Sequence, residues 1–308
     1  MPRIPHDHTC TSRWKRDHTG TMASAPPGYS VFREYDAVVA ESIITIDGDI
    51  LWCDITRGLI RRSTPGSPVD GSADTVLQLP IPVCSFHPAH SGFVASLADR
   101  VILADPAGRV LRTLATVHHA STRMRLNEGK VDPAGRWITG SMELTNSAPI
   151  GAFYAVTPNG DLRELIGGIG TANGLEWSPD GTKIYFTDTS IDTIFVGTYT
   201  TDGDINNVDV FHSGAPHDGL VIDSDGNFWG AIFGEGRVIH LDPDGHEITS
   251  ITLPAPNLTS VAFHANTLYV ASAREKLSPQ QLRDHPLSGS VFAIETQTTG
   301  PKVRTFDA

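Results

Sequence analysis

Residues 125–137 read Arg125-Leu126-Asn127-Glu128-Gly129-Lys130-Val131-Asp132-Pro133-Ala134-Gly135-Arg136-Trp137, a polar segment followed by a tight turn and the start of an apolar strand. This unit decides the fold because similar units recur along the chain, centred on Trp52, Phe93, Trp137, Ile184, Phe228 and Leu268. The centres are about 40 to 47 residues apart, a spacing typical of the four-stranded blades of a β-propeller. Six centres therefore predict an all-β chain folded as a six-bladed β-propeller.

Turns that contain proline and glycine separate the predicted strands. Asp105-Pro106-Ala107-Gly108 and Ser178-Pro179-Asp180-Gly181 are two examples. Proline fixes the negative φ of the second residue in such a turn, and glycine accepts the positive φ that follows. Each of these segments therefore predicts a tight connection between neighbouring strands.

Helical periodicity is almost absent, with one exception in an insertion at residues 274–287. Ser278 and Gln281 are spaced as in a capping box and predict a short helix that interrupts the last blade. Insertions between regular elements often shape a binding site. We expect this one to pack over the rim of the propeller, with Leu277 and Leu282 turned inward, and to influence which substrate enters.

The repeat predicts one domain over residues 26–308, preceded by an extension of residues 1–25. The extension is polar and carries potential ligands for a transition metal at His6, His8, Cys10 and His18. Its low hydrophobicity nevertheless favours a disordered segment over a metal site.

Charge and cysteine content limit the partners and the compartment. The formal net charge is −12 and no stripe of Lys and Arg is present, which argues against a nucleic-acid partner. The sequence has no apolar run typical of a secretory signal or a membrane span, so no membrane association is expected. Cys10, Cys53 and Cys84 cannot all pair within one chain and match no zinc or redox motif, so we expect the reducing cytoplasm.

Polar side chains precede the first strand of several predicted blades, where they can point at the mouth of the central channel. The segments are Ala40-Glu41-Ser42, Arg125-Leu126-Asn127-Glu128-Gly129, Ala172-Asn173-Gly174-Leu175 and His217-Asp218-Gly219-Leu220. Glu41, Asn173 and Asp218 offer only oxygen atoms, which suits a hard divalent cation such as calcium, magnesium or manganese. Asn-Gly and Asp-Gly are also the commonest turn dipeptides, so Asn173-Gly174 and Asp218-Gly219 could each be a simple turn.

These four segments, together with Leu287-Ser288-Gly289-Ser290-Val291-Phe292, resemble the senescence marker protein, regucalcin and gluconolactonase family. The resemblance runs from about residue 29 to residue 306. It implies a six-bladed propeller with one catalytic metal held by Glu41, Asn173 and Asp218, with Asp218 as the general base. It also implies that Arg125 and Asn127 meet the hydroxyl groups of the substrate, although a structural tie across the mouth is the alternative for both.

Two positions depart from the family pattern. Many members have a further substrate-contacting glutamate where an ungapped count reaches Thr145, and the nearby Glu143 is the candidate for that role here. The proline that usually precedes the catalytic aspartate is His217, which places a titratable group beside the proposed base.

The sequence thus predicts a hydrolase acting on a carboxylic ester, a metal-dependent lactonase that opens a five- or six-membered sugar-acid lactone. One divalent cation is the expected cofactor, with Ca²⁺ as the first choice and Zn²⁺, Mn²⁺, Mg²⁺ or Fe²⁺ as alternatives. The expected partner is a small lactone, and no oligomeric state is predicted. The alternative functions are a non-catalytic, calcium-binding regulatory propeller and a hydrolase of phosphoesters or organophosphates.

Overall fold

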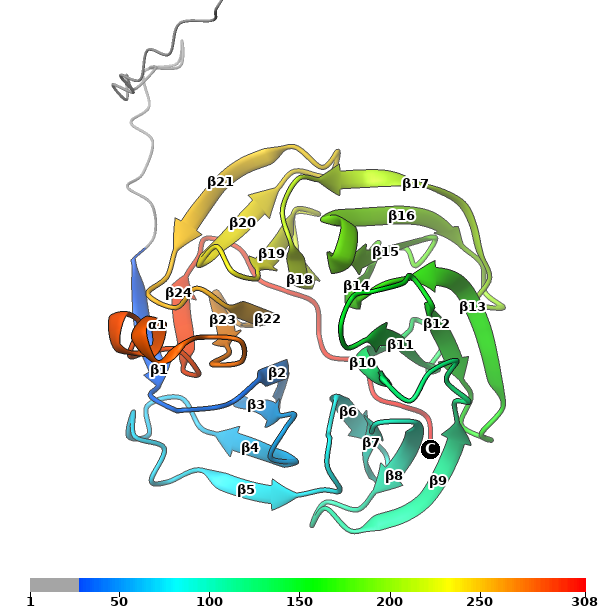
Figure 1. Cartoon of the computed structure of the whole chain (residues 1–308), viewed down its shortest axis with the longest axis horizontal. Coiled ribbons are helices and arrows are strands. Elements are labelled where there is room, and N and C mark those ends of the chain that lie inside the picture. Colours follow the sequence, from blue (N-terminus) through cyan, green and yellow to red (C-terminus); the bar gives the residue numbers. More distant parts are fainter. Residues whose placement is uncertain (1–27) are drawn as a thin grey trace, which may run out of the picture.

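The computed structural model describes residues 28–308, in which six four-stranded antiparallel sheets surround a central channel (Figure 1). Blades 1 to 3 consist of β2 (Ala40–Ile46), β3 (Asp49–Asp54), β4 (Leu59–Ser63), β5 (Thr75–Gln78), β6 (Ser85–Ala89), β7 (Gly92–Ser96), β8 (Arg100–Ala104), β9 (Val110–Thr116), β10 (Met124–Val131), β11 (Trp137–Glu143), β12 (Gly151–Val156) and β13 (Leu162–Ile169). Blades 4 to 6 consist of β14 (Ala172–Trp177), β15 (Lys183–Asp188), β16 (Thr193–Tyr199), β17 (Ile205–Ser213), β18 (His217–Ile222), β19 (Phe228–Ile232), β20 (Arg237–Leu241), β21 (Glu247–Thr252), β22 (Leu258–His264), β23 (Thr267–Ser272), β24 (Val291–Glu295) and β1 (Tyr29–Arg33). The predicted all-β, six-bladed propeller is therefore confirmed. The expected extension of residues 1–25 and its metal-binding side chains lie outside the described residues.

Every repeat centre recognised in the sequence lies on the second strand of a blade. The three tryptophans at positions 52, 137 and 177 are fully buried, and Phe93 and Leu268 are buried as well. Hydrophobic clusters join neighbouring blades, as where Leu51 of blade 1 packs in one cluster with Phe86 of blade 2. The core is thus a ring of interfaces between blades, because each sheet buries both faces against its neighbours.

The N-terminal strand closes the ring. β1 pairs antiparallel with β24, so blade 6 combines one strand from the start of the chain with three from its end. Arg33, at the end of β1, is fully buried and its Nε lies 3.1 Å from the Asp74 carboxylate of blade 1. This closure joins residues far apart in the sequence, and the repeat pattern did not predict it.

The C-terminal segment closes one end of the channel. It crosses the centre of the ring after β24 (Figure 1), and residues 301–304 line a small cavity there with Lys130 and Glu176. Phe306 is completely buried, and its backbone N–H donates to the carbonyl of Pro88 at 2.8 Å. A ligand can therefore reach the inner strands through the opposite mouth.

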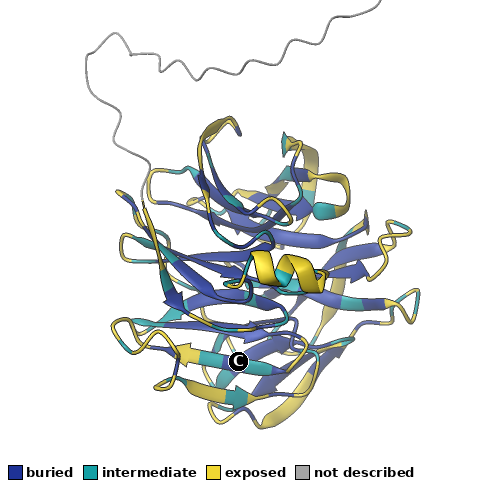
Figure 2. Ribbon diagram, turned by 60° about the vertical axis from the view of Figure 1, so that its left-hand side comes forward, coloured by how far each residue is buried: buried dark blue, intermediate teal, exposed yellow. Residues whose placement is uncertain are grey.

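The predicted helix in the last blade is present as α1 (Pro279–Asp284). Ser278 and Gln281 form the expected capping box at its start. The helix has no buried residue and lies on the outside of the molecule (Figure 2), while Leu277 and Leu282 are half-buried. Among residues 28–308, no helix is long and apolar enough to cross a membrane.

Two identical turn sequences, residues 105–109 and 132–136, sit in different environments. In both turns the aspartate accepts backbone N–H groups two and four residues later, and the arginine Nε donates to its second oxygen. Asp132 is fully buried and also accepts the hydroxyl of Tyr199 at 2.7 Å, whereas the Arg109 partner of Asp105 is largely exposed.

Asp132→Asn is therefore expected to destabilise the protein by about 3 kcal/mol, because it leaves the half-buried Arg136 without its counter-charge. The control, Asp105→Asn in the same turn sequence, should cost much less because its ion pair is exposed to water. Chemical unfolding of both variants measures the difference. Equal losses of unfolding free energy would show that the turn geometry, not the buried charge pair, carries the stabilisation.

Candidate functional site

Irregular hydrogen bonding in the inner strands aims the candidate side chains at the channel. The register between the first and second strands shifts in blades 1, 3, 4, 5 and 6, at residues 41–44, 126–129, 173–175, 217–220 and 258–261. Such bulges turn a strand locally and are common beside binding sites. Blade 2 pairs without a shift. No feature of the sequence predicted these bulges, although four of the five overlap the four segments singled out above.

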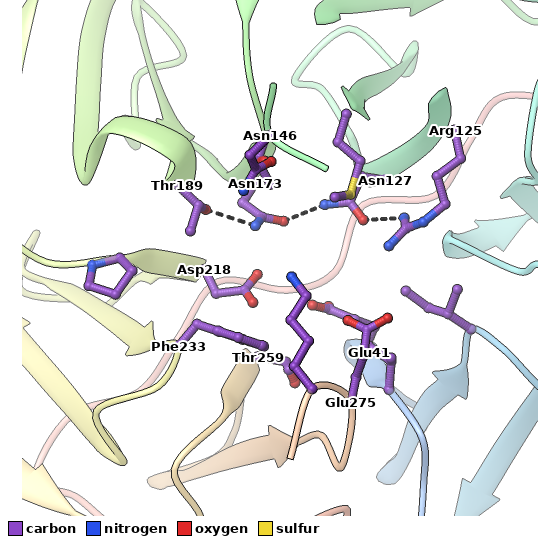
Figure 3. Close-up of a pocket in the computed structure, with 16 residues that line it drawn as sticks. Glu41, Arg125, Asn127, Asn146, Asn173, Thr189, Asp218, Phe233, Thr259 and Glu275 are labelled. Atoms are coloured by element: carbon purple, nitrogen blue, oxygen red, sulfur yellow. Dashed lines mark hydrogen bonds between the residues drawn. The ribbon is translucent and has the colours of Figure 1, made fainter. Parts of the chain in front are cut away.

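A pocket of about 210 Å³ occupies the open mouth of the channel (Figure 3). Side chains from blades 1, 3, 4, 5 and 6 line it, and blade 2, the blade without a bulge, contributes none among the described residues. The lining includes Glu41, Arg125, Asn127, Asn173 and Asp218. Five residues predicted from four separate segments of the sequence thus meet in one pocket of a size that suits a small molecule.

The predicted metal ligands combine two acids and one amide. Glu41 lies on β2, Asn173 on β14 and Asp218 on β18. Within residues 28–308 no cluster of three or more His, Cys, Asp or Glu side chains could hold a metal ion, so a site here depends on the Asn173 amide.

The two carboxyl groups lie in an environment that disfavours their negative charge. Burial, followed by repulsion from Glu128, raises the pKa of Glu41 to about 8. Burial, followed by repulsion from Glu41 and Glu128, raises the pKa of Asp218 well above its ordinary value. A divalent cation between the carboxylates would offset both effects, and three oxygen ligands suit Ca²⁺ or another hard cation. The residues present therefore fit a divalent metal.

Asn173 is held in a fixed orientation by its neighbours. Its Oδ1 accepts from Asn127 Nδ2 at 2.6 Å, and its Nδ2 donates to Thr189 Oγ1 at 2.8 Å, as Figure 3 shows. Thr189 belongs to a short 3₁₀ helix, η1 (Thr189–Ile191), that follows β15. Both hydrogen bonds fix the plane of the amide, with its oxygen toward Asn127 and its nitrogen toward Thr189.

The Asn-Gly and Asp-Gly pairs are not turns. Both lie in inner strands, and a Cβ on Gly174 would stand 2.4 Å from Thr187 Oγ1 and 2.6 Å from the carbonyl oxygen of Asp218. Gly219 approaches Thr259 and Ser260 in the same way. The glycines are needed for close contact between neighbouring inner strands, so the turn interpretation was wrong at both positions.

Arg125 and Asn127 are linked to each other and to the metal ligands. Arg125 Nη1 donates to the carbonyl of Leu126 at 3.0 Å and also to Asn127 Oδ1. Asn127 Nδ2 donates to the carbonyl of Ala172 at 2.9 Å in addition to Asn173. The oxygen and the nitrogen of the Asn127 side-chain amide therefore both have partners within the protein, as expected for a structural link across the mouth. Arg125 lines the pocket.

Glu143 lies outside the pocket, so the structure does not support the predicted substrate contact. Its buried carboxylate accepts from the backbone N–H groups of Thr145 and Ser147 at 3.0 and 2.9 Å and from Arg123 Nε at 2.9 Å. The bond from the Ser147 backbone N–H above all, and then the side-chain bonds from Arg123 and Thr145, lower the pKa of Glu143 to about 2. Asn146, in the turn that this carboxylate stabilises, lines the pocket instead.

His217 does not introduce a group that titrates near neutral pH. The ring is buried, neither of its nitrogens has a hydrogen-bond partner in the described structure, and it packs edge-on against His212. Burial, with smaller contributions from His212 and Arg237, lowers the pKa of His217 to about 3. The ring therefore stays uncharged beside Asp218, which corrects the expected influence on the proposed base.

Sequence reasoning missed several residues of the site. Glu128 stood in the quoted motif without a role, yet it lines a narrow cavity deeper in the channel and acts on the carboxyl groups of Glu41 and Asp218. Thr189 gave no signal in the sequence. From the insertion of residues 274–287, Glu275 and Lys276 line the pocket, whereas no residue of α1 does.

Comparison with known proteins agrees with the family resemblance of the sequence motifs. The family model described as "SMP-30/Gluconolactonase/LRE-like region" matches residues 39–274. The chain is 34% identical over 260 residues to 6-deoxy-6-sulfogluconolactonase of Pseudomonas putida, covering 82% of this chain and 88% of that protein. It is 31% identical over 286 residues to L-arabinolactonase of Azospirillum brasilense, covering 87% and 94%. The crystal structure of a calcium-binding protein, regucalcin, from Agrobacterium tumefaciens is similar with a TM-score of 0.83 and 26% identity, covering 92% of this chain and 98% of that one.

Proposed function

Because the chain belongs to the SMP-30/gluconolactonase/LRE-like family, we propose that it is a lactonase that hydrolyses a sugar-acid lactone with the help of one divalent cation. The observation that carries this proposal is the meeting of Glu41, Asn173 and Asp218 at the open mouth of the channel. Two relatives bear the names of sugar lactonases, which supports a lactone as the substrate class.

Ca²⁺ is the cation we propose first. The donor set contains only oxygen atoms, and one similar structure is that of a calcium-binding protein. Zn²⁺, Mn²⁺, Mg²⁺ and Fe²⁺ are alternatives that the same three ligands could bind. When bound, the cation would supply Lewis acidity toward the carbonyl of the lactone ring.

Asp218 is proposed as the general base. A cation beside its carboxylate would lower the pKa that burial raises, so that the group is ionised at neutral pH. One carboxylate oxygen would then accept a proton from water as the water oxygen attacks the ring carbonyl carbon. The bond between that carbon and the ring oxygen then breaks, and the ring oxygen takes up the proton that Asp218 accepted and becomes a hydroxyl group of the free acid.

Arg125 is proposed to orient the lactone. Its guanidinium lines the pocket and is held in place by Asn127 and the carbonyl of Leu126. The remaining N–H groups can donate to oxygen atoms of the substrate. Asn127 would act on the substrate through Arg125 and Asn173, since its own polar atoms already have partners.

A calcium-binding protein without turnover is the second candidate, and the similarity to the calcium-binding regucalcin of Agrobacterium tumefaciens favours it. Hydrolysis of a panel of five- and six-membered aldonolactones separates the two. We expect rates well above the uncatalysed reaction for at least one lactone, and their loss when the metal is removed by a chelator. Tight Ca²⁺ binding with no hydrolysis of any lactone would favour the second candidate, and hydrolysis of a phosphoester alone would favour neither.

A further inference from the structure

Lys276 adopts a backbone conformation that lysine rarely takes. It is the third residue of the turn that begins at Arg274, in which Leu277 N–H donates to the Arg274 carbonyl at 3.2 Å. Its φ is +63°, in the left-handed region that glycine occupies without strain. The surrounding structure must hold this backbone in an unfavourable conformation. Residues in such conformations are concentrated at functional sites, so a functional role for the lysine side chain is worth testing.

The turn is anchored at the rim of the pocket from two sides. The backbone N–H groups of Arg274 and Glu275 both donate to the carbonyl of Val38 at 3.0 Å, beside the entry to blade 1. Asn257 Nδ2 donates to the carbonyl of Glu275 at 2.7 Å, from the entry to β22. These bonds fix the backbone of the turn at the rim. The side chain of Lys276 therefore starts from a fixed position beside the mouth of the channel.

The ammonium group of Lys276 is available to a ligand. Its side chain lines the pocket and its Nζ lies 5.5 Å from the centre of the Phe233 ring, a contact that orients the side chain and leaves the positive charge unneutralised. Lys130, by contrast, pairs with the Glu176 carboxylate at 3.1 Å, and no ion pair of Lys276 occurs among residues 28–308.

Lys276 stands opposite Arg125 across the pocket. It belongs to blade 6, which faces blade 3 and Arg125 across the ring. Its neighbour Glu275 lies across the pocket from Asn127 (Figure 3). Blade 6 also lies between blade 5, which carries Asp218, and blade 1, which carries Glu41, so Lys276 borders the metal ligands and stands opposite Arg125. A lactone that Arg125 holds on one side would therefore present its other side to Lys276.

We propose that Lys276 binds a negatively charged substituent of the substrate, so that the protein prefers a sugar lactone that carries a carboxylate, sulfonate or phosphate group. This inference rests on the proposed lactonase activity and specifies its substrate class. Glu41, Asp218 and Glu275 make the pocket rich in acids, and an anionic group entering it needs a cation that the protein does not already use. Arg125 is proposed to hold the lactone itself, so Lys276 is the cation of the pocket that is left for the charged substituent.

The test compares lactones that share a ring and differ in charge. Glucono-1,5-lactone is the neutral probe, and 6-deoxy-6-sulfoglucono-1,5-lactone, 6-phosphoglucono-1,5-lactone and glucaro-1,5-lactone are anionic probes that distinguish sulfonate, phosphate and carboxylate. For the wild-type protein we expect at least one anionic lactone to have the higher kcat/KM, with a KM that rises with ionic strength.

Lys276→Gly is the informative variant, because glycine suits the positive φ and should leave the fold intact. The ratio of kcat/KM for the preferred anionic lactone over the neutral one should fall about tenfold or more, mainly through KM. Lys276→Arg, which keeps the charge, should retain most of that ratio.

Three outcomes would overturn the inference. An equal loss on charged and neutral lactones in Lys276→Gly would show that the lysine serves the reaction in general. A wild-type preference for the neutral lactone would exclude an anionic substrate and leave the proposed lactonase activity standing. A wild-type protein that hydrolyses none of these probes would contradict the proposed function together with this inference.

Discussion

Asp218→Ala is expected to abolish lactone hydrolysis and to weaken divalent-cation binding in the same variant. Asp218 is both a proposed metal ligand and the proposed base, and its carboxylate points into the pocket beside Glu41. Loss of a general base alone typically lowers kcat by about 10² to 10⁴-fold, and loss of the metal adds to this. Steady-state kinetics and calcium binding by calorimetry measure the two effects.

Two further variants make this result specific. Asp218→Asn keeps the shape and one oxygen ligand but cannot accept the proton, so its metal affinity should fall less than its turnover. Glu143→Gln removes another fully buried carboxylate that lies outside the pocket, and it should lower thermal stability while the metal stays bound. Full turnover and full metal content in Asp218→Ala would exclude the proposed site.

Glu41→Gln is expected to change metal affinity and the stability of the metal-free protein in opposite directions. Because glutamine carries no charge, the metal site loses one of its two anionic ligands. The affinity for the cation should therefore fall about 100-fold or more. In the metal-free protein the same change removes a negative charge that burial and repulsion from Glu128 both disfavour. The variant should therefore be more stable than the wild type at pH 8.

The pH dependence of this effect follows from the raised pKa of Glu41. Its carboxyl has a pKa of about 8 in the folded, metal-free protein against an ordinary value of 4.5, so the folded state binds the proton more tightly. The stabilisation from the neutral form is fully present below about pH 4.5 and is lost as the pH rises through 8, at a total cost of a few kcal/mol. Glu41→Gln should flatten this decline in thermal melts under chelator. A metal-free wild type whose melting temperature is the same at pH 5 and pH 8 would contradict the burial of these charges.

The repeat of apolar second strands was sufficient to predict the propeller. Trp52, Trp137 and Leu268 fill equivalent places between blades, and one local rule therefore accounts for six sheets. The closure by β1 could not be predicted in this way, because its pairing with β24 depends on contacts across the whole chain. The C-terminal segment that blocks one end of the channel has no repeat to reveal it.

The candidate site was predicted in its composition but not in its geometry. Glu41, Asn173 and Asp218 could be found because each stands at the start of an inner strand, at multiples of the blade spacing. The bulges that turn them toward one pocket leave no mark in the sequence. The predicted substrate contact of Glu143 lacks structural support for a similar reason, since counting along the chain could not show that the following turn binds its carboxylate.

Lys276 illustrates the same limit at the rim of the pocket. In the sequence Lys276 is one residue of an insertion in which only the short helix has a recognisable pattern. The capping box of that helix was predicted correctly. Its role depends on a positive φ and on backbone bonds to Val38, which are properties of the folded chain.

The central claim is that one divalent cation, held by Glu41, Asn173 and Asp218, is required for lactone hydrolysis. Its most direct test is the initial rate of hydrolysis of the best lactone substrate by metal-stripped protein, titrated with Ca²⁺ at a protein concentration above the dissociation constant. We expect almost no rate without metal, a linear rise that ends at one equivalent per chain, and no rise in Asp218→Ala. A full rate in the stripped protein, or an equal recovery in Asp218→Ala, would contradict the claim.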